Sequence, residues 1–127
     1  MKFLACALLV LFSFSAASAG ETQWVLDGKP LNFITAPNGL KVAHCGRRAG
    51  ALDCAAVRAL GSVRSSNLKK LRTGHEDANP VALLCKSLVG HPVIGTDSRQ
   101  DEKSFCKFND GSLCASLDLF VAAKKNH

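Results

Sequence analysis

The stretch Phe105-Cys106-Lys107-Phe108-Asn109-Asp110-Gly111-Ser112-Leu113-Cys114 places two cysteines on either side of a tight turn. The residues before the turn, 104–108, predict a strand, and residues 113–123 predict a closing helix. A two-residue turn at Asp110-Gly111 would place Cys114 opposite Lys107. A three-residue turn over 109–111 would place Cys114 directly opposite Cys106, near enough for a disulfide bond. The stretch therefore predicts a small disulfide-stapled hairpin that is followed by a helix.

The residues upstream of this hairpin predict a helix. Asn79 is a natural N-cap, and Pro80 suits the first helical position. Apolar residues, Cys85 among them, recur over 81–88 at the spacing of one helix face, and Gly90 follows the helix. Residues 92–94 predict a further strand. The second half of the chain is therefore expected to be a helix, a hairpin and a second helix.

The first half predicts a similar order of elements. Strands are expected at 24–26, 31–35 and 40–43, a helix at 52–60, and a second short helix or a basic linker at 62–74. Gly28-Lys29-Pro30-Leu31 resembles Gly90-His91-Pro92-Val93, and the cysteines that follow each stretch lie at nearly equal distances from it. This self-similarity predicts two copies of one hairpin-plus-helix unit in an α+β fold.

The N-terminus has the three parts of a secretory signal: a basic Lys2, a short apolar run and Ala17-Ser18-Ala19. The apolar run is shorter than the roughly 20 residues that a membrane-spanning helix needs. We expect cleavage after Ala19, which removes Cys6 and leaves an exported chain in the periplasm or outside the cell. In an oxidising compartment, disulfides are the expected state of the five remaining cysteines.

The second half also resembles a known family. An Asn-Pro opening at Asn79-Pro80, the helix cysteine Cys85, and the Asp-Gly-Ser loop between Cys106 and Cys114 are similar to a short bacterial domain of unknown function whose members often carry the label hemolysin. The match covers 78–120. The chain has Leu117 where the family usually has a tryptophan, and it lacks the family's last cysteine. The resemblance implies an exported cell-envelope protein, and the label is a name rather than a mechanism.

These features divide the chain into four parts. They are a signal peptide (1–19), a first, degenerate hairpin-plus-helix unit (20–61), a basic linker or short helix (62–77), and the hemolysin-like unit (78–127).

Five cysteines allow fifteen ways to form two disulfides and leave one thiol. If the two units are copies, equivalent cysteines pair equivalently, which predicts the bonds Cys45–Cys54 and Cys106–Cys114. Cys85 is then a free, buried thiol, consistent with the missing family cysteine.

Positive charge is concentrated in one segment. Residues 46–74 hold seven basic residues and one acidic residue, a net charge of +6. Such a segment is either a solvated surface or a site that attracts anionic lipid or lipopolysaccharide. The candidate residues for an anionic surface are Arg47, Arg48, Arg64, Lys69, Lys70 and Arg72.

The sequence shows no pattern typical of an enzyme, a metal site or a cofactor site. The cysteine spacings of nine and eight residues differ from those of zinc sites, and no phosphate loop or nucleophile elbow is present. We therefore expect a non-enzymatic envelope or binding module that has an envelope ligand or protein as its partner and does not bind nucleic acid. Two alternatives are a membrane-perturbing hemolysin-like protein and a small protease inhibitor that uses the loop 109–112 as a rigid plug.

Overall fold

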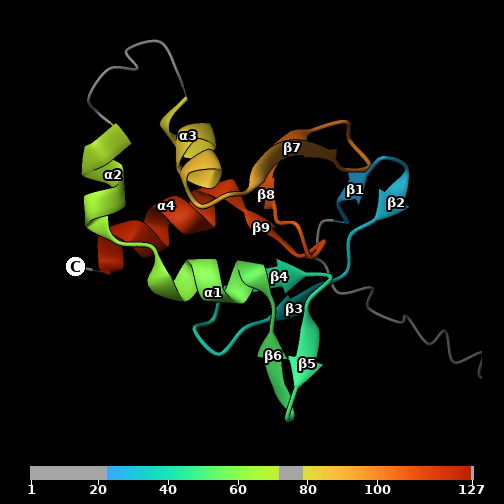
Figure 1. The fold of residues 1–127 in the computed structure, drawn as a ribbon. Coiled ribbons are helices and arrows are strands. Elements are labelled where there is room, and N and C mark those ends of the chain that lie inside the picture. The colour runs from blue at the N-terminus through green and yellow to red at the C-terminus, as the bar shows by residue number, and fades with distance from the viewer. Residues whose placement is uncertain (1–22, 72–78, 127) are drawn as a thin grey trace, which may run out of the picture.

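The computed structural model describes residues 23–71 and 79–126, and within them the chain has an α+β fold with two disulfide bonds. Seven strands form a curled antiparallel sheet in the order β2-β1-β7-β8-β9-β4-β3, and β5 and β6 form a separate two-stranded ribbon (Figure 1). The elements are β1 (Val25–Leu26), β2 (Lys29–Pro30), β3 (Phe33–Thr35), β4 (Lys41–Ala43), β5 (Gly46–Arg48), β6 (Ala51–Asp53), α1 (Ala55–Ser62), α2 (Ser65–Leu71), α3 (Pro80–Ser87), β7 (His91–Thr96), β8 (Glu102–Lys107), β9 (Leu113–Ala115) and α4 (Ser116–Lys125). The predicted signal peptide lies outside the described residues.

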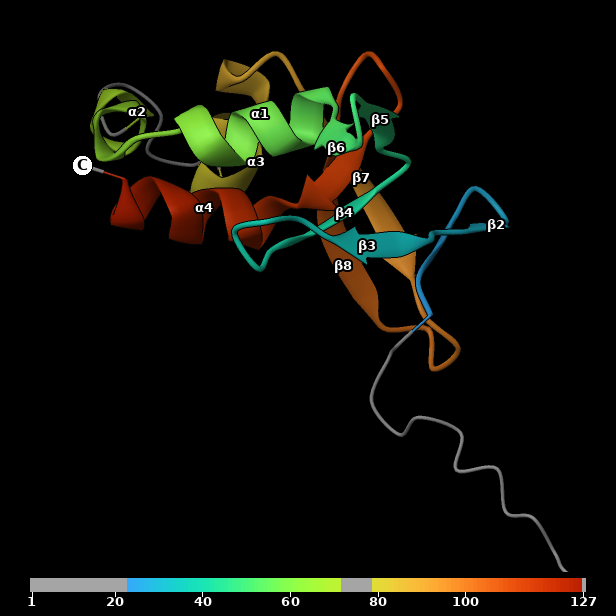
Figure 2. The same ribbon diagram turned by 90° about the horizontal axis from the view of Figure 1, so that it is seen from below.

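The predicted α+β class is confirmed, as is the order of a hairpin followed by a helix in each half. The two halves do not fold as separate layers, because β4 of the first half pairs with β9 of the second and joins both hairpins into one sheet. The helices lie together at one side of this sheet, as both views show (Figures 1 and 2).

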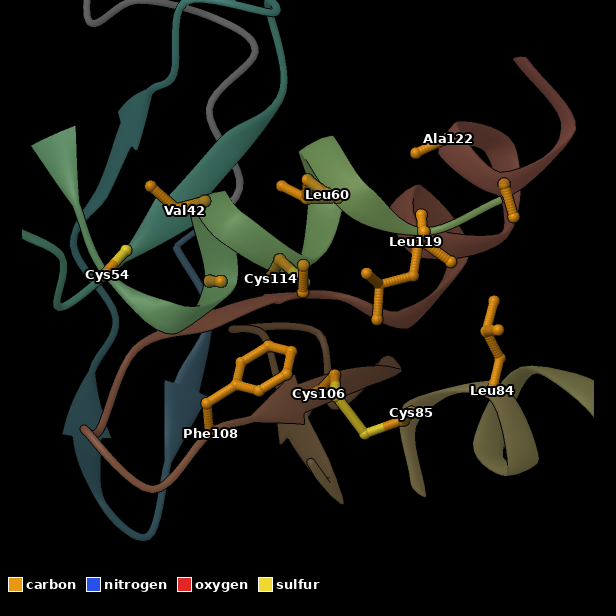
Figure 3. Packing of buried hydrophobic residues seen from close by; sticks show 14 residues of the cluster. Val42, Cys54, Leu60, Leu84, Cys85, Cys106, Phe108, Cys114, Leu119 and Ala122 are labelled. Carbon is orange, nitrogen blue, oxygen red and sulfur yellow. A yellow bond between two sulfur atoms is a disulfide. The ribbon is translucent and has the colours of Figure 1, made fainter. Parts of the chain in front are cut away.

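Where β4, β8 and β9 pair, the sheet is buried on both faces, and its residues alternate between two apolar clusters. Val42, Cys106 and Cys114 face the helices and pack in the main core with residues such as Leu60, Leu84 and Leu119 (Figure 3). Their neighbours Ala43, Phe105 and Leu113 belong to a smaller cluster, which Leu31, Trp24 and Phe33 complete. This smaller cluster lies beneath the candidate site described below.

Two predicted helices begin later in the structure. The helix expected from residue 52 begins at Ala55, because Ala51–Asp53 pair as β6 with β5. The helix expected from residue 113 begins at Ser116, because Leu113–Ala115 pair with β8 and β4. The third helix begins where the sequence predicts, and the Asn79 side chain accepts a hydrogen bond of 3.0 Å from the Val81 N–H. The segment expected to be a second short helix or a linker contains α2.

The disulfide prediction is half right. Cys45–Cys54 is confirmed, with its Cα atoms 5.3 Å apart. The predicted Cys106–Cys114 bond is wrong, because Cys106 bonds to Cys85 and the buried Cys114 is the free thiol. Cys85 is therefore bonded rather than free, and the two halves do not have equivalent disulfides.

The register of the second hairpin is nevertheless the one expected for a three-residue turn, with Cys106 directly opposite Cys114. The Phe108 N–H donates to the Ser112 carbonyl, so this pair is of the hydrogen-bonded type. Because the two pair types alternate along an antiparallel ladder, Cys106 and Cys114 also form a hydrogen-bonded pair, in which the side chains are the more widely spaced. Disulfides need Cβ atoms about 3.8 Å apart, and the wider spacing of a hydrogen-bonded pair makes this separation harder to reach than it is in a non-hydrogen-bonded pair.

Helix α3 supplies the better partner for Cys106. The Cys85 side chain points from this helix toward the sheet, and Figure 3 shows the sulfur–sulfur bond that joins α3 to β8. Gly90 lies beside this bond, where a Cβ atom would be 2.9 Å from Cys85 Sγ and would overlap Cys106 Sγ. Cys45 pairs instead with the cysteine across its own hairpin, and the described part of the first half, which begins at Gln23, has no helix before β1.

Helix α1 is capped by a distant loop. Its N-cap residue, Cys54, makes no side-chain hydrogen bond to the helix. Instead, the Asp110 carboxylate accepts a bond of 2.7 Å from the Ala55 N–H, and the Ser112 hydroxyl accepts one of 3.0 Å from the Ala56 N–H. The Asp-Gly-Ser loop thus satisfies two N–H groups that every helix leaves unpaired at its N-terminus.

This cap should make stability depend on pH. Burial raises the pKa of Asp110, but hydrogen bonds from Ser112 and Ala55 and the charge of Arg58 outweigh burial and leave it below its ordinary 3.8. A carboxylate with a lowered pKa stabilises the fold above its unfolded pKa, and this contribution is lost as the pH falls through the folded pKa. We expect the free energy of unfolding in urea to fall more steeply below about pH 4 for the wild type than for Asp110→Asn.

Asp27→Asn makes the same chemical change at an exposed turn and serves as the control, and it should follow the wild type. Equal pH slopes for Asp110→Asn and the wild type would show that the cap is not electrostatic.

Candidate functional site

A pocket opens over the smaller apolar cluster. Its volume is about 490 Å³. Its floor is apolar and almost fully buried, and consists of Leu31, Phe105 and Ala115. The pocket lies between the N-terminal segment, the β3–β4 hairpin, β8 and the first turn of α4, so residues from across the described chain build it. Cavities of this size in a curled sheet are common sites for small ligands.

Aromatic side chains form the walls of the pocket. Trp24 packs edge-to-face on Phe105 with ring centroids 5.9 Å apart, and Phe33 stacks on Phe105 at 5.6 Å. Both outer rings are only half-buried, and Phe105 is 1% exposed. The strands fix these rings, because β8 carries Phe105 on the face opposite Cys106 and β3 carries Phe33 in register with Ala43.

Charged side chains surround the opening. The Lys103 ammonium lies over two rings, 5.5 Å from the centroid of Trp24 and 5.7 Å from that of Phe105. Lys41 and Asp118 also line the pocket. Burial raises the pKa of Asp118 above its ordinary value, and the positive charge of Lys103 acts against this shift. The site therefore combines flat apolar surface with two ammonium groups and one carboxylate.

The sequence did not indicate this site. The patterns around Trp24 and over 104–108 predict only strands, and Lys103 lies about eighty residues from Trp24 in the chain. The available signal was an aromatic residue two positions after a lysine in a strand, which is too common to identify a site. Sheet pairing, through β1 with β7 and β7 with β8, brings these residues together.

The candidate anionic-surface residues do not form one patch. Arg47 and Arg48 belong to the β5–β6 ribbon, whereas Lys69 and Lys70 belong to α2. Arg64 immediately precedes α2, and Arg72 lies outside the described residues. Both views place the ribbon and α2 at opposite ends of α1 (Figures 1 and 2). The high charge of the segment is therefore divided between two regions of the surface.

The loop 109–112, proposed above as the plug of a protease inhibitor, contacts the start of α1. Ser112 is fully buried, and its hydroxyl donates to Asp110 at 2.6 Å while accepting from the backbone of α1. Asp110 is exposed but is oriented toward α1 by its bond to Ala55. These contacts hold the side chains of Asp110 and Ser112 against α1.

Cys114, the free thiol among the described cysteines, is expected to be unreactive. Burial, with a smaller effect from the negative charge of Asp118, raises the pKa of Cys114 to about 12. Thiolates rather than thiols are nucleophilic, so this side chain should react slowly at neutral pH. Among the described residues, no helix has the length and apolar character needed to cross a membrane.

Comparisons with protein-family models, with curated proteins and with solved structures find no match for this chain. Inferences about its activity therefore rest on the residues themselves.

Proposed function

We propose that this chain is an exported, non-enzymatic envelope module that binds a small ligand in the pocket between Trp24, Phe33 and Phe105. The observation that carries the proposal is the pocket itself: its aromatic walls are half-buried, and its floor is part of the apolar core. Ligand sites combine such apolar surface with a few polar groups that orient the ligand. The two disulfides are typical of a protein that works outside the cytosol, which agrees with export.

The geometry gives the two alternatives less support. A membrane-perturbing role through the basic segment would need its charges to act together, and the fold separates them. A protease inhibitor that uses the loop 109–112 would need outward side chains, whereas Asp110 and Ser112 bind α1. Leakage from anionic vesicles would support the first alternative, and protection of a protease's target would support the second.

Native mass spectrometry tests the proposed function. The protein should be isolated from envelope extract without denaturation and compared with Phe33→Ala, which removes one pocket wall. Ile94→Ala is the matched control, because Ile94 is an exposed apolar side chain outside the pocket. We expect a small-molecule adduct on the wild type and on Ile94→Ala that Phe33→Ala loses. An adduct that survives Phe33→Ala, or no adduct on any of the three, would contradict the proposal.

A further inference from the structure

If the pocket binds a small ligand, as the proposed function states, its chemistry restricts the class of that ligand. The apolar part of the pocket consists of the half-buried rings of Trp24 and Phe33 above the buried side chains of Leu31, Phe105 and Ala115, and polar residues line the rest. A volume of about 490 Å³ accommodates one ring-sized apolar body with substituents. The stacked and edge-to-face contacts with Phe105 hold the outer rings in place, so a ligand meets a preformed surface.

The charges around the opening are unequal. Lys103 on β8 and Lys41 on β4 contribute two positive charges, and Asp118 at the start of α4 contributes one negative charge. Lys103 is held above the rings of Trp24 and Phe105, where the ring faces attract its ammonium group. An ammonium in this position lies beside any apolar body that rests on the rings. The Lys103 ammonium, held beside such a body, favours an anion over a cation.

We infer that the pocket takes a small molecule with one flat apolar body and a single anionic group, with the body against Trp24 and Phe33 and the anion beside Lys103. The Lys103 ammonium selects for the charge of the ligand, and the rings of Trp24 and Phe33 select for its shape. Asp118 opposes any second negative group, which limits the ligand to a single anion.

Three probes with the same flat benzyl body separate charge from shape: phenylmethanesulfonate, benzyl alcohol and benzylammonium. Trp24 is the single tryptophan of the chain, so its fluorescence reports directly on the pocket. We expect the sulfonate to bind at least about tenfold more tightly than the alcohol, and the ammonium to bind most weakly.

Lys103→Met keeps the length of the side chain and removes its charge. It should abolish most of the preference for the sulfonate and leave alcohol binding nearly unchanged. Lys86→Met is the matched control, because Lys86 is exposed on α3 and outside the pocket, and it should retain the preference. Asp118→Asn should tighten sulfonate binding several-fold, because Asp118 is the only carboxylate among the described residues that line the pocket.

The outcomes separate the two levels of the argument. If none of the three probes changes Trp24 fluorescence, the pocket is not a ligand site and the proposed function fails with it. If the alcohol binds as tightly as the sulfonate, or Lys103→Met keeps the preference, the pocket still binds ligands and the anionic class is wrong. Unchanged melting temperatures for the variants confirm that the comparison concerns folded protein.

Discussion

Gly90→Ala is expected to destabilise the protein by about 3 kcal/mol, although it adds a single methyl group. The added Cβ would overlap Cys106 Sγ, lie 2.9 Å from Cys85 Sγ and lie 3.1 Å from the Cys85 carbonyl oxygen. A disulfide and a backbone carbonyl cannot rotate away as a flexible side chain can, so α3 or β7 must shift. Since a small domain has a total stability of roughly 5–15 kcal/mol, this loss should be plain in urea unfolding.

Gly61→Ala is the control for this experiment. A Cβ added at Gly61 meets nothing within 4 Å, and this residue lies in α1. Replacing a helical glycine with alanine should stabilise the protein by roughly 0.5–1 kcal/mol. If Gly90→Ala unfolds at the same urea concentration as the wild type, Gly90 does not make room for the disulfide.

The same argument predicts coupling between Gly90 and the disulfide. In a protein that carries Cys85→Ala and Cys106→Ala, the two sulfur atoms nearest the added Cβ are gone. In this background Gly90→Ala should lower the free energy of unfolding clearly less than it does in the wild type. The difference between the two losses is the interaction energy of a double-mutant cycle. An equal cost in both backgrounds would assign the effect of Gly90→Ala to the backbone alone.

Removing the Cys85–Cys106 bond is expected to have a similarly large effect. The bond spans 21 residues, and a loop of this length corresponds to about 3 kcal/mol of unfolded-state entropy. Both cysteines are fully buried, so Cys85→Ala with Cys106→Ala also loses packing in the main core. The comparison is the double variant Cys45→Ala with Cys54→Ala. It should lose less free energy of unfolding, because that bond spans nine residues and Cys45 is only half-buried.

Peptide mapping without reduction checks the connectivity on which this expectation depends. The peptides should show Cys45–Cys54 and Cys85–Cys106, with Cys114 alkylated only after denaturation. A Cys106–Cys114 peptide would restore the pairing that the duplication predicts. It would also remove the reason for expecting Gly90→Ala to be severe.

The structure changes what the Asp-Gly-Ser loop means. In the sequence, the loop is the most specific part of a family resemblance and suggests an exposed functional element. In the fold, Asp110 and Ser112 take the place of the missing side-chain cap of α1. The motif thus links the second hairpin to the helix of the first half, and this structural role accounts for its polar residues.

The sequence by itself determined the features that depend on neighbouring residues. Asn79 and Pro80 specify where α3 begins, because capping acts over three residues. Asn109-Asp110-Gly111 specifies a tight turn at this place, although the sequence left a two-residue and a three-residue turn open and the structure shows the register of the three-residue turn. The α+β class follows from the same local patterns.

Only the tertiary structure decided three features: the disulfide partner of Cys106, the groups that cap α1 and the place of the pocket. Each of these depends on groups that are distant in the chain: Cys85 is 21 residues from Cys106, and Asp110 is 55 residues from Ala55. Such contacts follow from the packing of α3, α4 and the hairpins around one sheet, and no local spacing encodes that packing. The self-similarity of the two halves predicted equivalent disulfides, but α3 brings Cys85 to Cys106 and so gives the second half a different bond.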